Sequence, residues 1–161
     1  MLQAGDLAPD FDAPALIGGV KKRFHLAEWL GKHNIVLAFY PSNWEPVSAQ
    51  QMTAFQRELG KLQSQGVELA AVCVDSIMNT TVWERDIGPF DFPLCSDFWP
   101  HGEISRRYAV LRDREPFRGS SERAFFLVDK SGRIVFREIY SPAEFPDLSE
   151  PLGVFTGIGA R

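Results

Sequence analysis

The sequence predicts an α/β fold in which helices flank a mixed central β-sheet. Three apolar runs of strand length, at residues 34–40, 67–75 and 92–97, alternate with segments that have helical spacing of apolar residues. A further β-rich region, residues 123–140, contains the turn sequence DKSG and is typical of a β-hairpin. Strands joined through helices pair in parallel and a hairpin pairs antiparallel, so the sheet should contain both kinds of pairing.

The run at residues 34–40 is the expected centre of the sheet. Its sequence NIVLAFY is apolar throughout, which is typical of a strand covered on both faces. The next segment has apolar residues at helical spacing and then a glycine: Met52, Phe55, Leu59, Leu62 and Gly66. Two shorter helices are expected, around residues 80–86 and at residues 102–110.

The length of 161 residues fits one domain that spans residues 1–161. Its tail, from about residue 141, has the sequence SPAEFPDLSEPLGVFTGIGAR. This tail is rich in proline and glycine, so we expect it to wrap the surface or to contact a partner.

The charge balance excludes several classes of partner. The formal net charge is −4 and no segment is dense in lysine and arginine, which argues against nucleic acid and anionic membranes. The first residues, MLQAGDLAPDFDAP, lack the basic and apolar regions of a signal peptide, and no segment reaches the length of a membrane span. We therefore expect a cytoplasmic protein.

Residues 38–52, AFYPSNWEPVSAQQM, form the expected reaction centre. In open α/β sheets, ligands bind beyond the carboxyl ends of the strands. Pro46 suits the first position of a helix, which makes Glu45 the N-cap and puts Ser48 in the first turn. Free backbone N–H groups in that turn stabilise an anion and lower the pKa of a thiol. They do far less for a serine, whose hydroxyl needs an adjacent general base.

A serine hydrolase is the weakest interpretation of Ser48. Glu45 can lie beside Ser48, but a capping carboxylate is a weak base for an alcohol. The three histidines lie in unrelated contexts, and no GxSxG sequence surrounds the serine. A polar residue in the first turn of a helix is the simpler interpretation.

The stretch FYPSNWEPVSAQQM resembles the signature of the peroxiredoxins (the AhpC/TSA group), which reads FYPxxF/W-T/S-P-V-C-x-x-E/Q. Further blocks in the family's order extend the resemblance over roughly residues 3–142: GDLAPDF, AAVCVDS, FPLCSDFWP and SSERAFFLVDKSGRI. The tryptophan in NWEPV is similar to the AhpE-like or one-cysteine-like subgroup.

This resemblance implies a thioredoxin-like fold and a specific reaction. A thiolate attacks the O–O bond of a hydroperoxide, and a thiol reductant then reduces the resulting sulfenic acid. Peroxiredoxins are commonly at least dimers, so the resemblance also implies a homodimer. We expect no cofactor and no metal, because the sequence has neither a metal-ligand cluster nor a dinucleotide-binding glycine loop.

The family's active-site residues fall on Pro41, Glu45, Ser48 and Arg123. Pro41 and Arg123 match the family, in which the proline shields the site and the arginine supplies positive charge. The other two positions depart from it. The family has threonine or serine at the position of Glu45, and its peroxidatic cysteine at the position of Ser48.

These two departures predict that peroxidase activity is lost or impaired in this chain. A serine hydroxyl stays protonated at neutral pH and has no sulfenic state. A carboxylate about 5 Å from the reacting atom would oppose a second anion by about 3 kcal/mol at an effective dielectric near 20, or about 2 pKa units. Pairing of Arg123 with Glu45 would screen that charge.

Three explanations of Ser48 stay open at this point. The protein is a naturally degenerate peroxiredoxin, or an active peroxiredoxin that carries an engineered Cys→Ser change at position 48. Alternatively it is a binding or regulatory module that uses the vestigial pocket or the family's dimer surface. The codon at position 48 separates the first two explanations.

The two cysteines, Cys73 and Cys95, lie in predicted strands that should be neighbours in the sheet. Buried cysteines are usually inert and behave as small apolar residues, so we expect a structural role for both. A disulfide between them depends on the register of the strands. Trp44 and Trp83 are expected to be packing or interface residues.

Overall fold

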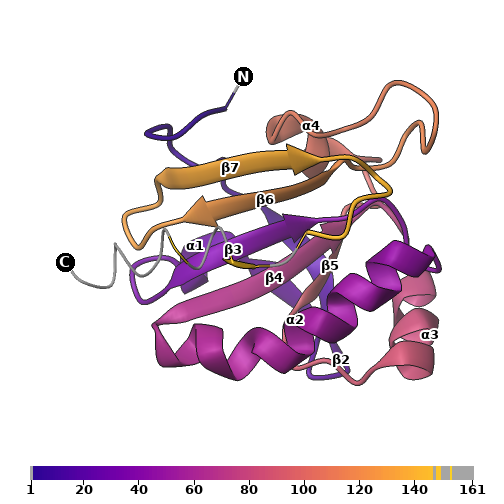
Figure 1. Cartoon of the computed structure of the whole chain (residues 1–161), viewed down its shortest axis with the longest axis horizontal. Helices are drawn as coiled ribbons and strands as arrows, with labels where there is room; N and C mark the ends of the chain where they lie inside the picture. Colours follow the sequence, from indigo (N-terminus) through magenta and orange to yellow (C-terminus); the bar gives the residue numbers. More distant parts are fainter. Residues whose placement is uncertain (1, 147, 150–152, 154–161) are drawn as a thin grey trace.

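A seven-stranded mixed sheet forms the centre of the computed structural model, which describes residues 2–146, 148, 149 and 153 (Figure 1). The strand order is β2-β1-β5-β4-β3-β6-β7. The strands are β1 (Asp12–Ile17), β2 (Val20–His25), β3 (Asn34–Phe39), β4 (Val67–Cys73), β5 (Leu94–Ser96), β6 (Arg123–Val128) and β7 (Ile134–Tyr140). The helices are α1 (Leu26–Trp29), α2 (Pro46–Ser64), α3 (Ile77–Ile87) and α4 (Glu103–Arg107).

The pairing of the strands confirms the mixed sheet. β3 pairs in parallel with β4, and β4 in parallel with β5, as strands connected through helices do. β6 pairs antiparallel with both β3 and β7. All six residues of β3 are buried, as the continuous apolar sequence predicts for a central strand.

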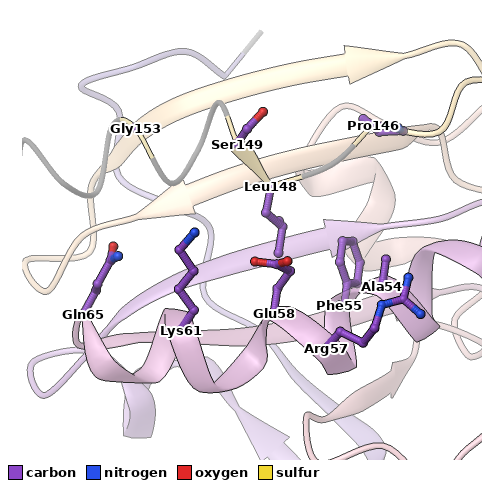
Figure 2. Close-up of a pocket in the computed structure, with 10 residues that line it drawn as sticks. All are labelled: Ala54, Phe55, Arg57, Glu58, Lys61, Gln65, Pro146, Leu148, Ser149 and Gly153. Carbon is purple, nitrogen blue, oxygen red and sulfur yellow. The ribbon is translucent and has the colours of Figure 1, made fainter.

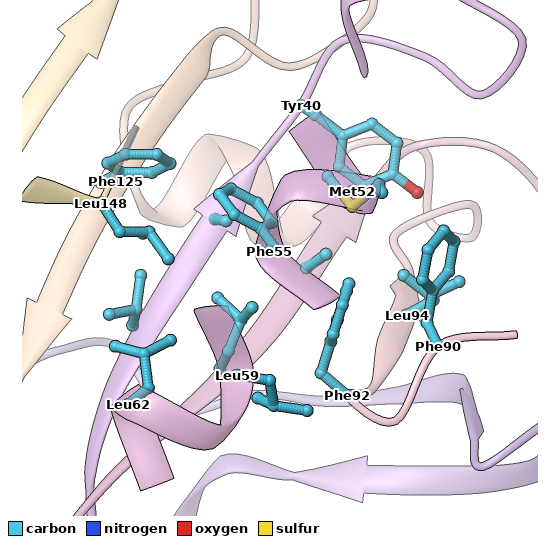
Figure 3. Close-up of a cluster of buried hydrophobic side chains, with 14 of the residues drawn as sticks. Tyr40, Met52, Phe55, Leu59, Leu62, Phe90, Phe92, Leu94, Phe125 and Leu148 are labelled. Carbon is cyan, nitrogen blue, oxygen red and sulfur yellow. The ribbon is translucent and has the colours of Figure 1, made fainter. Parts of the chain in front are cut away.

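The two faces of the sheet hold two separate apolar clusters. Alternate residues of β3 contribute to each, because successive side chains of a strand point to opposite faces. On one face, α2 buries the apolar residues that predicted it: Met52, Phe55, Leu59 and Leu62 (Figure 3). Leu148, from the tail, is buried in the same cluster. Tyr108 and Phe126 lie in the cluster on the other face.

The N-terminal hairpin of β1 and β2 was not predicted from the sequence. β2 is an edge strand whose first four residues are exposed, so its sequence VKKRFH shows little of the apolar pattern that marks a strand. The hairpin turns at Gly18 and Gly19, which both have positive φ values, 61° and 77°, that suit glycine.

Two of the expected helices differ in extent from the prediction. α3 begins at Ile77, earlier than expected, because the Ser76 side chain accepts a hydrogen bond from the N–H of Asn79 and caps the helix. α4 ends at Arg107, and Ala109 just beyond it has a positive φ of 59° that a helix cannot continue. None of the helices in the described residues is long and apolar enough to cross a membrane.

Candidate active site

Ser48 lies in the first turn of α2, just beyond the carboxyl end of β3. Pro46 is the first residue of the helix and Glu45 is its N-cap, as predicted. The Glu45 carboxylate accepts hydrogen bonds from the backbone N–H groups of Val47, at 3.0 Å, and Ser48, at 2.7 Å. The N-terminus of α2 is therefore capped by a carboxylate from its own chain.

The hydroxyl of Ser48 lies between a carboxylate and a guanidinium. Its Oγ donates to Glu45 Oε2 at 2.7 Å and accepts from Arg123 Nη1 at 3.3 Å. The carboxylate is thus closer to position 48 than the 5 Å assumed from sequence. Ser48 has no exposed surface in this arrangement.

Arg123 reaches this site because of the register between two strands. It opens β6, which runs antiparallel to β3, and Phe39 near the end of β3 is paired with Ala124. The start of β6 therefore lies beside the end of β3, from which the chain turns into α2. The antiparallel pair thus brings residues 45, 48 and 123 together.

Arg123 is fully buried, and each of its N–H groups has an acceptor. Besides Ser48, Nη1 donates to Gln51 Oε1 at 2.8 Å. Nη2 donates to Glu45 Oε2 at 2.9 Å and to the main-chain carbonyl of Pro142 at 2.8 Å, and Nε donates to that carbonyl at 3.2 Å. A guanidinium has five N–H donors. These five contacts engage all of them.

The pKa shifts of Glu45 and Arg123 fit a charged pair. Burial acts to raise the pKa of Glu45, but hydrogen bonds from the Ser48 hydroxyl, two backbone N–H groups and Arg123 outweigh it and lower the pKa. Burial lowers the pKa of Arg123, and Glu45 offsets part of that effect. Because an arginine stays protonated in proteins, the pair is a carboxylate against a guanidinium.

Two partners of Arg123 were not named as site residues from the sequence. Gln51 occupies the last position of the quoted signature, E/Q, so the motif itself contained the signal. The contact with Pro142 could not be predicted from the sequence, because every residue has a main-chain carbonyl. Pro41 is buried in the turn between β3 and α2, and its shielding role stays a prediction.

The two tryptophans have different environments. Trp83 is buried and stacks on Tyr40 with ring centroids 5.7 Å apart, which confirms its packing role. Trp44 is half exposed, and its Nε1 donates to Asn79 Oδ1 at 3.0 Å.

Cys73 and Cys95 lie in neighbouring strands, as expected, but they cannot form a disulfide in this fold. β4 and β5 pair with Val72 opposite Cys95, so the two cysteines point to opposite faces of the sheet. Cys73 belongs to the apolar cluster under α2, and Cys95 to the cluster on the other face. Both are free thiols.

The site contains no candidate for metal chemistry. Across the described residues, no group of three His, Cys, Asp or Glu side chains is arranged to hold a metal ion.

We predict that neither cysteine reacts in the folded protein. Burial, and next the charge of Asp75, raise the pKa of Cys73 to about 12, and burial raises the pKa of Cys95 as well. The thiolate is the reactive form. A neutral aromatic disulfide reagent at pH 8 should therefore modify no thiol until denaturant is added, and two per chain afterwards. Modification of either cysteine in the folded protein would contradict this assignment.

We further predict that Glu45 makes the stability of the protein depend on acid pH. Its folded-state pKa lies below the ordinary 4.5, so its contribution is complete above that value and is lost as pH falls through the folded-state pKa. At pH 7, Glu45→Ala should lower the free energy of unfolding by about 3 kcal/mol, because a buried guanidinium loses its carboxylate.

Urea denaturation at pH 7 and pH 3 measures this effect. The difference between the variant and the unchanged protein should shrink at pH 3. Asp86→Ala, which removes an exposed acid from α3, should change stability by less than about 0.5 kcal/mol at either pH. An equal difference for Glu45→Ala at both pH values would rule out this electrostatic role.

Comparisons with known proteins identify the family of this chain. The sequence model described as the AhpC/TSA family matches residues 4–137. Alkyl hydroperoxide reductase E of Mycobacterium tuberculosis is 31% identical over 147 residues, which are 91% of this chain and 92% of the relative. A selenocysteine-containing peroxiredoxin of Peptoclostridium acidaminophilum is 33% identical over 145 residues, covering 86% of this chain and 68% of the relative.

Solved structures lead to the same family. The reduced 2-Cys peroxiredoxin of Plasmodium vivax superposes with a TM-score of 0.90 at 28% identity, over 98% of this chain and 82% of that one. The AhpC of Enterococcus faecalis gives a TM-score of 0.87 at 25% identity, over 98% and 93%. With its thioredoxin-like fold and its matching sequence, this chain belongs to the AhpC/TSA family, the peroxiredoxins.

Proposed function

We propose that this protein is a peroxiredoxin whose peroxidase chemistry is lost or impaired because serine occupies the position of the peroxidatic cysteine. The observation that carries the proposal is the environment of Ser48. Its hydroxyl lies at the start of α2, 2.7 Å from Glu45 and 3.3 Å from Arg123. In the family, a thiolate at this position would reduce the hydroperoxide, and a thiol reductant would regenerate it.

Ser48 cannot carry out that cycle. The first step needs an anionic sulfur that attacks one peroxide oxygen, keeps it as sulfenic acid and releases an alcohol or water. A serine hydroxyl is protonated at neutral pH and has no equivalent oxidised state. Among the described residues, the base bonded to its hydroxyl is the Glu45 carboxylate, whose lowered pKa makes it a poor acceptor for an alcohol proton.

Glu45 already supplies the negative charge at this helix N-terminus. Its carboxylate accepts from two backbone N–H groups of α2 and from Arg123, donors that would otherwise stabilise a thiolate. A thiolate about 3 Å from this carboxylate would be opposed by about 5.5 kcal/mol at an effective dielectric near 20, before the offset from Arg123.

A neutral hydroxyl, in contrast, donates to the carboxylate. Glu45 and Ser48 therefore fit each other, and this fit supports natural replacement over an engineered change. The codon at position 48 in the source gene tests this point: a cysteine codon would identify an active parent enzyme instead.

We predict that the protein consumes no hydrogen peroxide above the background rate of a thiol reductant alone. Ser48→Cys should give a weak peroxidase, because Glu45 disfavours the thiolate. Adding Glu45→Thr should raise the rate constant, because the fraction of thiolate rises about tenfold for each pKa unit that the thiol recovers, an effect only partly offset by the lower nucleophilicity of the less basic thiolate. Stopped-flow peroxide consumption and the pH dependence of thiol alkylation measure both quantities.

Two results would contradict the proposal. One is peroxide turnover by the unchanged protein that persists when Cys73 and Cys95 are both replaced by serine. The other is a single Ser48→Cys variant as fast as the double variant, with a thiol of equal pKa. Glu28→Thr, at an exposed position of α1, is the matched control for the Glu45 substitution.

A binding role in which the old pocket holds a small ligand receives less support. Ser48 and Arg123 have no exposed surface, and the donors of Arg123 are engaged by the chain itself. Thermal shift with small carboxylates and phosphate tests it. A rise in melting temperature that Arg123→Ala abolishes would favour such a role.

We also propose that the protein assembles as a homodimer through an apolar surface beside the site. Trp44, Met78 and Val82 are 51%, 68% and 52% exposed. Met78 and Val82 are four residues apart and share one face of α3, and the ring N–H of Trp44 is bonded to Asn79 of the same helix. Large apolar side chains grouped in this way are typical of a protein interface.

Sedimentation velocity tests this assembly. The unchanged protein should sediment as a dimer, and Met78→Lys with Val82→Lys should convert it to a monomer. Val20→Lys changes an equally exposed apolar residue on edge strand β2 and should leave the dimer intact. A dimer that survives the double substitution would place the interface elsewhere. The cytoplasmic location expected from the sequence stays a prediction.

A further inference from the structure

The chain segment after β7 contacts the buried arginine of the site. At residues 141–146, the N–H of Glu144 donates to the carbonyl of Ser141 at 3.0 Å, and the N–H of Ser141 donates to Glu144 Oε1 at 3.3 Å. Between these two residues, the carbonyl of Pro142 accepts both Arg123 Nε and Arg123 Nη2. Leu148 then anchors the segment in the apolar cluster that also holds Phe55 and Phe125 (Figure 3).

Cavities flank this segment where it passes α2. One, of about 430 Å³, lies between the helix and the segment; Arg57 and Lys61 line it from α2, and Pro146 and Leu148 from the segment. Figure 2 shows Leu148 pointing from the segment toward α2. A second cavity, of about 440 Å³, is lined by Ala49, Thr53 and Phe145. Arg57 lines both cavities, so the segment does not pack closely against α2 on either side of this residue.

The Pro142 carbonyl differs from the other acceptors of Arg123 in where it comes from. Glu45, Ser48 and Gln51 belong to the cap and the first turns of α2. None of them can leave Arg123 without a change in rotamer or the unwinding of that helix end. The carbonyl belongs to a separate segment, and its departure would free two N–H groups on one side of the guanidinium.

We propose that residues 141–146, anchored by Leu148, form a strap that keeps position 48 closed, and that release of the Pro142 carbonyl from Arg123 opens it. Any small molecule that is to bind the guanidinium must first displace one of its acceptors. The strap is the acceptor that can move as a unit while the helix stays folded. This role concerns access to position 48, so it holds whether or not the serine has any chemistry.

A thiol introduced at position 48 can report on the strap. In the Ser48→Cys background, the rate of alkylation by iodoacetamide is followed by peptide mass spectrometry from pH 7 to pH 10.5. The plateau of the alkylation rate at high pH reports how easily the reagent reaches the thiol. The midpoint of the pH profile reports the pKa of that thiol, so access and ionisation are measured separately. Cys73 and Cys95 provide internal references for global unfolding, because they are buried in the two clusters.

Adding Leu148→Ala should raise the plateau rate at position 48 at least about tenfold, because the anchor of the strap is lost. The matched control is Leu62→Ala, which truncates an equally buried leucine of the same cluster on α2. It should change the plateau less than about twofold. Equal acceleration by both variants, or none by Leu148→Ala, would overturn the proposal.

Glu144→Ala keeps the test decisive if Leu148→Ala fails to fold. Glu144 is exposed, and its loss removes only the hydrogen bond to Ser141 that closes the turn of the strap. The plateau rate should rise about threefold, while Asp86→Ala should leave it unchanged. An unchanged rate in Glu144→Ala would then overturn the proposal. Neither result of this alkylation test bears on the proposed function, which is tested separately by peroxide consumption.

Discussion

The buried guanidinium of Arg123 is the constraint on which the site depends. A cation with no exposed surface is tolerated only when anions and hydrogen-bond acceptors surround it. Here Glu45 supplies the anion, and Ser48, Gln51 and a main-chain carbonyl complete the set. The same carboxylate caps α2, so the charge of Arg123 and the free N–H groups of the helix are satisfied by one group.

This arrangement explains why serine is compatible with the position. Under the proposed function, the thiolate of an active peroxiredoxin would lie at the position of Ser48, at the helix N-terminus and beside the arginine. In this chain the carboxylate provides that charge one turn earlier, and the adjacent side chain must then be neutral. Serine meets that requirement, because its hydroxyl donates to the carboxylate and accepts from the arginine. We therefore expect the effects of substitutions at positions 45 and 48 on the free energy of unfolding to be non-additive.

Much of the fold and part of the site could be predicted from the sequence. The strand NIVLAFY and the helix with Met52 and Phe55 were predicted because buried elements carry strong apolar periodicity. Pro46 marked the helix start, and this fixed the roles of Glu45 and Ser48 at the cap. The hairpin of β1 and β2 was missed because an exposed, charged edge strand lacks that periodicity.

Other features depend on long-range geometry that no local pattern contains. The distance from Glu45 to Ser48 follows from the rotamer of a capping side chain. The opposite orientation of Cys73 and Cys95 follows from a register of parallel strands. The carbonyl of Pro142 lies 19 residues from Arg123 in the chain and is brought to it by the hairpin of β6 and β7.

The contact between Arg123 and the chain at Pro142 has a consequence for how this protein can change in evolution. The acceptor is a main-chain oxygen, so replacing the side chain at position 142 leaves the acceptor in place. Sequence comparison would therefore not mark this position as part of the site. The number of residues between Tyr140 and Leu148 matters instead, since one more or one fewer would shift the carbonyl relative to the guanidinium. Selection at this contact would act on insertions and deletions rather than on residue identity.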